Sequence, residues 1–327
     1  MLPDELSIID RFLRPLAGKG GFDFRDDAGV IAPPPGSELV VTTDMLARDV
    51  HFLRDPPDTI AKKALRVNLS DLAAKGATSM AYVLSLGVSP EIDEAWLAGF
   101  AQGLREDHTR YAIQLLGGDT IAVPDRTVIS ITAFGSVPKG RMVRRSGGQP
   151  GDLLYVSGTI GGSAAGLALL KGEKGPWSSL GKAKRDALIH RYRVPEPPIA
   201  LAPLLLEFAS AAMDVSDGLV GDCDKICAAS GCSAVIEADK VPLAAGLGES
   251  GPDLVARLLT HGEDFEILCT VSADKGGAFE AKASAAGVTV TKIGKLVEGL
   301  SLPTVQFEGR SLSLTRRAFV HGAGEKR

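Results

Sequence analysis

The first half of the chain alternates short runs of strand type with longer helical segments, and this alternation limits the folds that it can adopt. Residues 38–44 (ELVVTTD) form a β-branched run of the kind found in strands. Residues 56–77 open with two prolines and an N-cap candidate, Asp58, and end near a glycine, which predicts a helix. One further helix is expected at 93–111. Further strands are expected at 79–88, at 112–120, where the strand runs into a glycine turn before Asp119, and at 126–137. This order predicts an α/β layer whose strands pair within the chain or across a dimer.

A segment rich in glycine and arginine, residues 143–152 (VRRSGGQPGD), separates this half from a second one of similar style. A strand, a glycine turn and a helix are expected within residues 153–170, followed by more strand and helix patterns and a final hairpin. A chain of 327 residues is longer than one hydrophobic core usually serves. We therefore expect an α/β (α+β) protein of two domains, residues 1–148 and 149–327.

The composition argues against several classes of function. A formal net charge of −4 gives no sign of a nucleic-acid surface, which needs a strong basic excess. No run approaches the roughly 20 apolar residues of a membrane span, and the N-terminus lacks a signal-peptide pattern, so a cytoplasmic protein is expected. The four cysteines are expected to be reduced core thiols, with a zinc site near the first three as the less favoured alternative. They are Cys223, Cys227, Cys232 and Cys269.

Six aspartates stand out because small residues flank nearly all of them, and small neighbours let a ligand approach the backbone. They are Asp27, Asp44, Asp71, Asp119, Asp214 and Asp217. Any one of them alone is more often a turn former or an N-cap. Asp71 fits that interpretation least well. It lies beside the face of a helix on which Leu65, Leu69 and Leu72 are predicted to pack inward.

Several carboxylates facing one cleft repel one another, and some would protonate unless a cation lies among them. Oxygen ligands without His or Cys select Mg²⁺ or Mn²⁺, and Mg²⁺ usually binds one or two carboxylates together with waters and substrate phosphates. The acidic stretch 213–225 (MDVSDGLVGDCDK) also gathers carboxylates that need positive charge nearby. We expect two or more Mg²⁺ ions to balance these acids and to recruit a polyphosphate such as ATP.

The usual nucleotide-binding signatures are missing from the sequence. There is no GxxxxGK[ST] loop, and the SGTIGG stretch at 157–162 is only a loose glycine turn. If the protein transfers phosphoryl groups, metal ions and a few basic residues must replace the Walker loop. The candidates are Arg144 and Arg145, and Lys75 is a less favoured one. An arginine pair before a glycine turn is as often part of a solvated loop.

The motifs occur in an order that closely resembles the thiamine-monophosphate kinase family. They are DDAGV, TTDMLARDVHF, NLSDLAAKGA, GGDT, GRMVRRSGGQPGD, DVSDGL and GEDFEIL, spread over residues 26–268. The family belongs to a superfamily with aminoimidazole ribonucleotide synthetase, selenophosphate synthetase and a hydrogenase maturation protein. The most specific of these stretches is TTDMLARDVHF, whose two ends together are typical of the kinase branch.

The resemblance implies ATP-dependent phosphorylation of thiamine monophosphate to thiamine diphosphate. It implies direct in-line transfer of the γ-phosphoryl group, with several Mg²⁺ ions and no phosphoenzyme. The implied fold is an N-terminal ATP-binding domain whose strands form a barrel across a homodimer, followed by a C-terminal α/β domain, with ATP between them. Because the acceptor is already an ionised phosphate, we expect no essential general base.

The resemblance also implies roles for individual residues. The metal shell would be Asp27, Thr42, Thr43, Asp44, Asp71, Asp119, Asp214 and Asp217. Among these, the residues most directly concerned with catalysis would be Asp44, Asp71, Asp119 and Asp214. ATP would contact Gly118, Asp119, Arg145 and Ser216, and the acceptor would contact His51, Glu263 and Phe319. The chain departs from the family pattern at Arg25, and an aspartate usual after the C-terminal aromatic residue is missing.

Two alternatives compete with the kinase interpretation. One is another ATP-dependent enzyme of the superfamily, but the chain has no Cys before residue 223 and none near its C-terminal end, as two of those relatives require. The other is a nucleotide-binding regulatory protein without turnover. The retained aspartates and Arg145 argue against it, because costly residues usually change once chemistry is lost.

Overall fold

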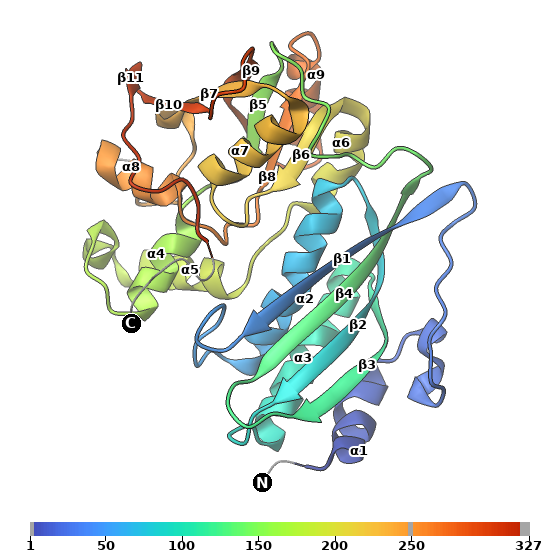
Figure 1. Ribbon diagram of the computed structural model, residues 1–327. Coiled ribbons are helices and arrows are strands. Elements are labelled where there is room, and N and C mark those ends of the chain that lie inside the picture. Colours follow the sequence, from blue (N-terminus) through green and yellow to red (C-terminus); the bar gives the residue numbers. More distant parts are fainter. Residues whose placement is uncertain (1–2, 248–250, 321–327) are drawn as a thin grey trace. The chain divides into compact units, whose positions relative to one another are not determined.

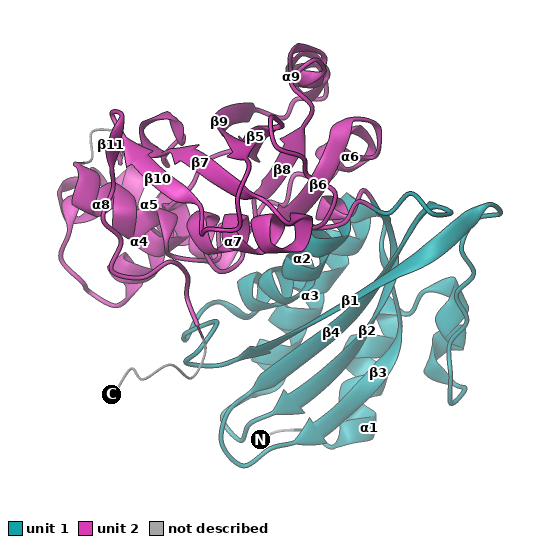
Figure 2. Cartoon of the chain, turned by 45° about the horizontal axis from the view of Figure 1, so that its top comes forward, with its two compact units in different colours: residues 1–72, 77–142 teal, residues 73–76, 143–327 magenta. Residues whose placement is uncertain are grey.

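The computed structural model describes residues 3–247 and 251–320, and these form two compact units. Unit 1 comprises residues 1–72 and 77–142, and unit 2 comprises residues 73–76 and 143–327, shown in teal and magenta in Figure 2. The change from unit 1 to unit 2 adjoins the glycine- and arginine-rich segment in which the sequence predicts a boundary. The boundary after residue 148 itself stays a prediction.

Unit 1 is a four-stranded sheet with two long helices on one face (Figure 1). The strand order is β1-β4-β2-β3; β2 and β3 are parallel, and the other two pairings are antiparallel. The elements are α1 (Glu5–Ile8), β1 (Ser37–Ala47), α2 (Pro57–Ala74), β2 (Thr78–Val88), α3 (Glu94–Tyr111), β3 (Gln114–Ala122) and β4 (Val128–Pro138). The strands and helices predicted for the first half are thus all confirmed, with small shifts of their ends.

The core of unit 1 lies between this sheet and its helices. Leu65, Leu69 and Leu72 of α2 are completely buried, as their spacing predicts. In β1 the buried residues Val40 and Leu46 alternate with exposed ones, so every second side chain faces the helices. Thr42 and Asp44 lie between these two on the same face.

Two predictions about strand ends are wrong. Asp44 does not end its strand, because β1 continues to Ala47 and Asp44 pairs with Ile131 in the ladder. The glycines before Asp119 do not form a turn either. Gly117 and Gly118 lie inside β3, where a register shift against β2 absorbs them. Gly117 has φ 159°, and an irregularity of this kind is a usual place for glycine in a strand.

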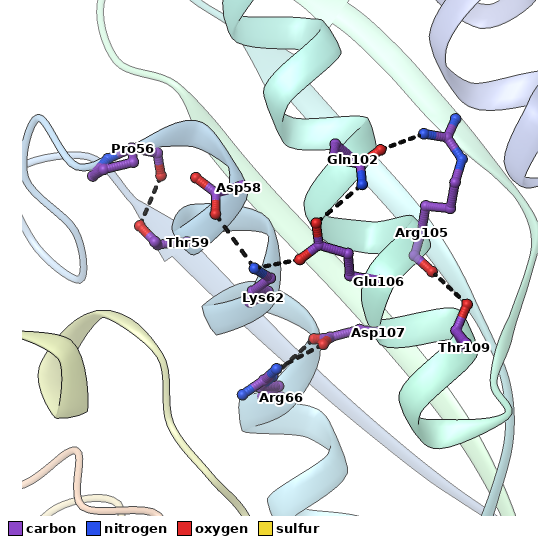
Figure 3. A network of polar contacts seen from close by, with 10 residues as sticks. All are labelled: Pro56, Asp58, Thr59, Lys62, Arg66, Gln102, Arg105, Glu106, Asp107 and Thr109. Atoms are coloured by element: carbon purple, nitrogen blue, oxygen red, sulfur yellow. Dashed lines mark hydrogen bonds and ion pairs between the residues drawn. The ribbon is translucent and has the colours of Figure 1, made fainter.

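A polar network joins α2 to α3 (Figure 3). The Arg66 guanidinium donates two hydrogen bonds to the Asp107 carboxylate, at 2.9 and 2.8 Å, and both side chains are buried. Nearby, Lys62 lies between Asp58 and Glu106, at 3.3 and 2.7 Å. The helix pair is therefore joined by a paired buried charge at its centre and by more exposed ion pairs around it.

Unit 2 contains a seven-stranded mixed sheet with the order β11-β10-β7-β9-β5-β8-β6. Its strands are β5 (Leu153–Ser157), β6 (Ala209–Asp214), β7 (Ser233–Glu237), β8 (Ile267–Val271), β9 (Val290–Val297), β10 (Thr304–Phe307) and β11 (Arg310–Ser311). Its helices are α4 (Gly162–Leu170), α5 (Lys182–Arg193), α6 (Ala202–Phe208), α7 (Leu219–Ser230), α8 (Pro252–Leu259) and α9 (Gly276–Ala285). The expected strand, glycine turn and helix after the boundary are β5 and α4, and the final hairpin is β10–β11.

Apolar clusters pack around this sheet. One contains α7 and β7, and another contains α6 and α9. All four cysteines are buried and free, as the core interpretation predicts. Among the described residues, no helix combines the length and the apolar character that crossing a bilayer requires.

The Arg66–Asp107 pair yields a stability prediction. Replacing Asp107 by alanine leaves a buried guanidinium without its carboxylate, so we expect a loss of about 3 kcal/mol in the free energy of unfolding. Asp10→Ala removes an exposed i, i+4 pair with Arg14 and should cost less than about 1 kcal/mol. Urea denaturation of both variants measures the difference. Equal losses would show that the buried pair contributes no more to the free energy of unfolding than the exposed pair does.

Candidate active site

The order of strands in unit 1 decides which predicted site residues meet within one chain. β1, which carries Asp44, is one edge of the sheet, and β3, which carries Asp119, is the other. Two strands lie between them, which separates the two strand axes by about 14 Å at the usual spacing. Their side chains also differ in environment, because Asp44 lies on the helix-covered face and Asp119 is exposed. The unit 1 acids therefore form two groups.

The first group lies at the β1 edge. Thr42 donates a hydrogen bond of 2.5 Å from Oγ1 to the Asp71 carboxylate of α2. Asp44 follows two residues later on the same face of the strand. Thr43 points to the opposite face, where its hydroxyl donates to the Ile131 carbonyl at 3.1 Å. Thr42 and Asp44 thus lie on the face of β1 that is turned toward Asp71, and Thr43 lies on the opposite face.

His51 lies in the turn that follows β1. Its Nδ1 accepts a hydrogen bond from the Ala47 N–H at 3.2 Å, and its carbonyl accepts one from Lys63 at 2.7 Å. Asp49 in the same turn has a left-handed backbone, with φ 64°. The Ala47 contact orients the imidazole and makes Nε2 the nitrogen that carries the proton in the neutral ring.

The second group lines a cavity of about 390 Å³ between β3 and the N-terminal segment. Asp27 and Asp119 both line it, together with the backbone of Gly117 and Gly118. Its apolar wall is formed by Ile9, Leu13, Ile31, Val83, Leu115, Leu116 and Phe134. Asp26 also lines it and was missed as a candidate, although the paired letters DD were the available signal. A cavity with an apolar wall, an edge of glycine backbone and acids suits a ligand that is part aromatic and part charged.

Close glycine packing holds the N-terminal segment against β3. A Cβ atom on Gly20 would lie 2.1 Å from the Val30 carbonyl oxygen, and one on Gly21 would lie 2.8 Å from that of Leu116. Gly18 donates a hydrogen bond to the Leu115 carbonyl at 2.7 Å. The glycine-rich stretch 18–24 (GKGGFDF) is therefore a wall of the cavity.

In unit 2 the acidic stretch 213–225 begins at the end of β6. Asp214 ends that strand and is 4% exposed. Asp222, in the first turn of α7, is fully buried, and its Oδ2 accepts hydrogen bonds from the N–H groups of residues 216, 217 and 218 at 3.0, 3.0 and 3.2 Å. Burial raises the pKa of the Asp222 carboxyl, and the ammonium group of Lys225, at 2.7 Å, acts against that rise. Asp222 thus shapes the loop 216–218, a role that the sequence did not reveal.

Protein cations balance much of this negative charge. Lys225 also donates to Asp217 at 2.5 Å, and Arg317 donates twice to Asp224, both at 2.6 Å. The expectation that metal ions balance the whole stretch is therefore wrong for Asp222 and Asp224. Asp217 is a predicted metal ligand of this stretch that Lys225 contacts.

Three of the predicted ATP and acceptor residues, Ser216, Glu263 and Phe319, come together at the loop 216–218. The Glu263 N–H donates to the Ser216 carbonyl at 2.8 Å, and the Phe319 N–H donates to the Asp217 carbonyl at 2.9 Å. Glu263 has φ 71°, and Phe265 has φ 52°. Left-handed backbone at two non-glycine residues so close together is strained, and such strain is most common at functional sites.

Two buried acids, Asp264 and Glu266, follow Glu263 and were missed in the sequence. Asp264 accepts the N–H of Gly161 at 2.9 Å and that of Ser163 at 3.3 Å, at the start of α4. Burial raises the pKa of the Asp264 carboxyl to about 7. Arg191 pairs with the Glu266 carboxylate and also donates to the Asp264 carbonyl at 2.9 Å. The backbone that follows Glu263 is thus held by the start of α4 and by Arg191.

The arginine pair lies along the edge of β6. The Arg144 carbonyl accepts the Ala212 N–H at 2.9 Å, and the Arg145 carbonyl accepts the Ser230 hydroxyl at 3.2 Å. Both side chains are exposed. Lys75 donates to the Ala212 carbonyl at 2.7 Å. The backbone of the pair is thus fixed beside the strand that leads to Asp214, and its guanidinium groups face solvent.

Magnesium fits these donor sets only in part. Within residues 3–247 and 251–320, no three His, Cys, Asp or Glu side chains gather as a metal site requires. Mg²⁺, however, takes few protein carboxylates when substrate phosphates complete its shell. Asp27 with Asp119 in the cavity, and Asp71 with Asp44 at the other edge, would each suit such an ion.

Comparison with known proteins shows the family to which the chain is similar. Residues 25–137 match the family model "AIR synthase related protein, N-terminal domain", and residues 149–302 match the corresponding C-terminal domain. The chain is 40% identical over 329 residues to a thiamine-monophosphate kinase from Caulobacter vibrioides, covering 98% of this chain and 91% of that protein.

Solved structures show the same similarity over both units. The crystal structure of thiamine-monophosphate kinase from Stenotrophomonas maltophilia has a TM-score of 0.81 at 35% identity, covering 95% of this chain and 98% of that one. A structure named "AaThiL complexed with AMPPCP and TMP" has a TM-score of 0.75 at 29% identity and covers 97% of both chains. The chain belongs to the thiamine-monophosphate kinase family of enzymes.

Proposed function

We propose that the protein phosphorylates thiamine monophosphate with ATP and yields thiamine diphosphate. The observation that carries the proposal is the similarity over 97% of the chain to a relative whose structure holds an ATP analogue together with the acceptor. The cavity at β3 supports it, because an apolar wall beside glycine backbone and acids suits a nucleotide. A cytoplasmic location remains our expectation.

We assign the six aspartates and two threonines of the predicted metal shell to divalent cations. The proposed magnesium ligands are Asp27, Thr42, Thr43, Asp44, Asp71, Asp119, Asp214 and Asp217. The proposed ATP contacts are Gly118, Asp119, Arg145 and Ser216, and the proposed acceptor contacts are His51, Glu263 and Phe319. Magnesium ions would neutralise the phosphates and hold donor and acceptor in line. Without such cations these carboxylates would repel both phosphorylated substrates, which is why we infer several of them.

The chemistry that we propose depends on position and charge more than on proton transfer. The acceptor oxygen belongs to a phosphate group that is largely ionised near neutral pH, so no side chain must remove a proton from it. In this proposal His51 acts neither as an acid nor as a base; its Nδ1 accepts the Ala47 N–H, and its Nε2–H would donate to the acceptor. The direct in-line transfer that follows needs no phosphoenzyme.

We further propose that two copies of the chain join through the sheet of unit 1. The face away from α2 and α3 exposes large apolar side chains, among them Val41 at 57% and Met45 at 64%. Both edges of the sheet, β1 and β3, lack a further strand within the described residues. A barrel formed with a second copy would cover these side chains and complete the edges. It would also bring acids of two chains around one lumen.

The carboxylate assignment predicts a loss of turnover. Asp44→Asn, Asp71→Asn and Asp119→Asn each remove a negative oxygen ligand, so we expect kcat/KM with MgATP to fall about a hundredfold or more. The exposed Asp125→Asn, on the β3–β4 connection of the same unit, serves as the matched control. Circular dichroism should show that all four variants keep their fold. Near-native turnover in the first three would reject the assignment.

One assay tests the substrate. The purified protein is given MgATP with either thiamine monophosphate or free thiamine, and the diphosphate product is detected. Phosphorylation of thiamine monophosphate alone is expected. Phosphorylation of free thiamine would reject the acceptor, and nucleotide binding without any turnover would favour the regulatory alternative.

The dimer proposal predicts the mass of the particle in solution. Light scattering should give twice the chain mass of 34.1 kDa for the unchanged protein. Val41→Asp with Met45→Asp places charge on the apolar face and should shift the mass to that of one chain. Leu6→Asp alters an equally exposed leucine of α1, away from the sheet, and should leave the mass unchanged. A monomer in all three cases would contradict the proposal.

A further inference from the structure

The C-terminal segment, residues 312–319, runs as an extended strap after β11 and is drawn in red in Figure 1. Its first part packs on the core of unit 2 through Leu312 and Leu314. The Leu312 N–H donates to the Val305 carbonyl at 2.8 Å, which ties the start of the strap to β10. Beyond this point the strap contains no regular secondary structure, so its path depends on side-chain contacts.

Three successive strap residues contact α7 and the loop before it, in descending order. Arg317 pairs with Asp224, Ala318 lies on Gly221, and the Phe319 N–H donates to the Asp217 carbonyl at 2.9 Å. Two of the contacted positions, 224 and 221, are three residues apart and lie on one face of α7, and the third, 217, lies in the loop before the helix. The strap therefore follows one face of α7 toward its N-terminal end.

The Arg317–Asp224 pair is the strongest of these contacts. Nε and Nη2 each donate to one carboxylate oxygen at 2.6 Å, and Nη2 also donates to the Pro303 carbonyl at 2.9 Å. The exposed fractions of the two side chains are 29% and 17%. A bidentate pair that is largely screened from water is well oriented and stronger than an ordinary surface pair.

Glycine at position 221 lets the strap lie close to the helix. A Cβ atom there would lie 2.4 Å from the Ala318 Cβ and 3.1 Å from the Arg317 carbonyl oxygen. Both distances are too short for ordinary packing, so the strap could not keep this path over any other residue. The Arg317–Asp224 ion pair and Gly221 together fix the position of Phe319.

We propose that Arg317 and Asp224 form a clasp that positions Phe319 and the adjoining loop 216–218 for recognition of the acceptor. This inference rests on the proposed function, because it assigns Phe319 to the acceptor. Arg317 is a positioning residue, since it acts through the strap. The loop itself keeps its shape through the three hydrogen bonds to Asp222, so loss of the clasp should release Phe319 more than Ser216.

Steady-state kinetics on the full-length protein test the clasp. Arg317→Ala should raise KM for thiamine monophosphate about tenfold and leave kcat and KM for ATP nearly unchanged, because Phe319 loses its bidentate support while the loop that carries Ser216 keeps its bonds to Asp222. The neighbouring Arg316 is exposed, and Arg316→Ala is the matched control, expected to match the unchanged protein. The double variant Arg317→Asp with Asp224→Arg restores opposite charges and should recover most of the lost affinity.

Hydrogen exchange at the Phe319 amide gives a readout that does not depend on activity. Exchange should become faster in Arg317→Ala and remain slow in Arg316→Ala, because the amide is bonded to the Asp217 carbonyl only while the strap is held. Unchanged exchange and unchanged KM in Arg317→Ala would overturn the clasp. A fall in kcat together with similar rises in KM for both substrates would also overturn it, because that result would indicate a general structural role. If the unchanged protein does not phosphorylate thiamine monophosphate, the proposed function fails, while the exchange measurement still decides whether the clasp exists.

Discussion

A buried carboxylate must have a partner, and this constraint sorts the acids of the protein into two kinds. Asp107 has the Arg66 guanidinium, Asp222 has three backbone N–H groups and Lys225, and Asp264 has the N–H groups at the start of α4. These acids already have partners within the protein, and their contacts stabilise the fold. Asp27 and Asp119, in contrast, are exposed beside a cavity. Their charge is available for a cation and, through it, for a phosphate.

The same constraint explains why neighbouring acids in the sequence have different roles. In the stretch 213–225, Asp222 points inward from the first turn of α7 and accepts hydrogen bonds from the N–H groups of the preceding loop. Asp224, two residues later, lies on another side of the helix and meets Arg317. Asp214 and Asp217 belong to the strand end and to the loop, where a ligand can approach the backbone. Helical geometry thus divides four similar residues into structural and candidate functional ones.

The sheet of unit 1 applies a second division. Its strand order places the acids of β1 and of β3 at opposite edges, and the two-residue period of a strand sends Thr42 and Thr43 to opposite faces. A single copy of unit 1 therefore offers two separate acidic groups. This separation, together with the apolar face between the edges, is the physical reason for proposing that two copies complete each other.

The sequence alone determined the elements of unit 1, the family and the candidate acids. It did so because strand and helix periods are local and because the motifs follow one another along the chain. The leucines of α2 illustrate this, since their spacing by itself placed them in the core. Only the tertiary structure decided that Asp44 and Asp119 lie inside strands at opposite edges, that Lys225 and Arg317 balance part of the acidic stretch, and that Phe319 reaches Asp217. These facts depend on strand order and on contacts between residues up to about a hundred positions apart, and no local pattern of residues encodes such contacts.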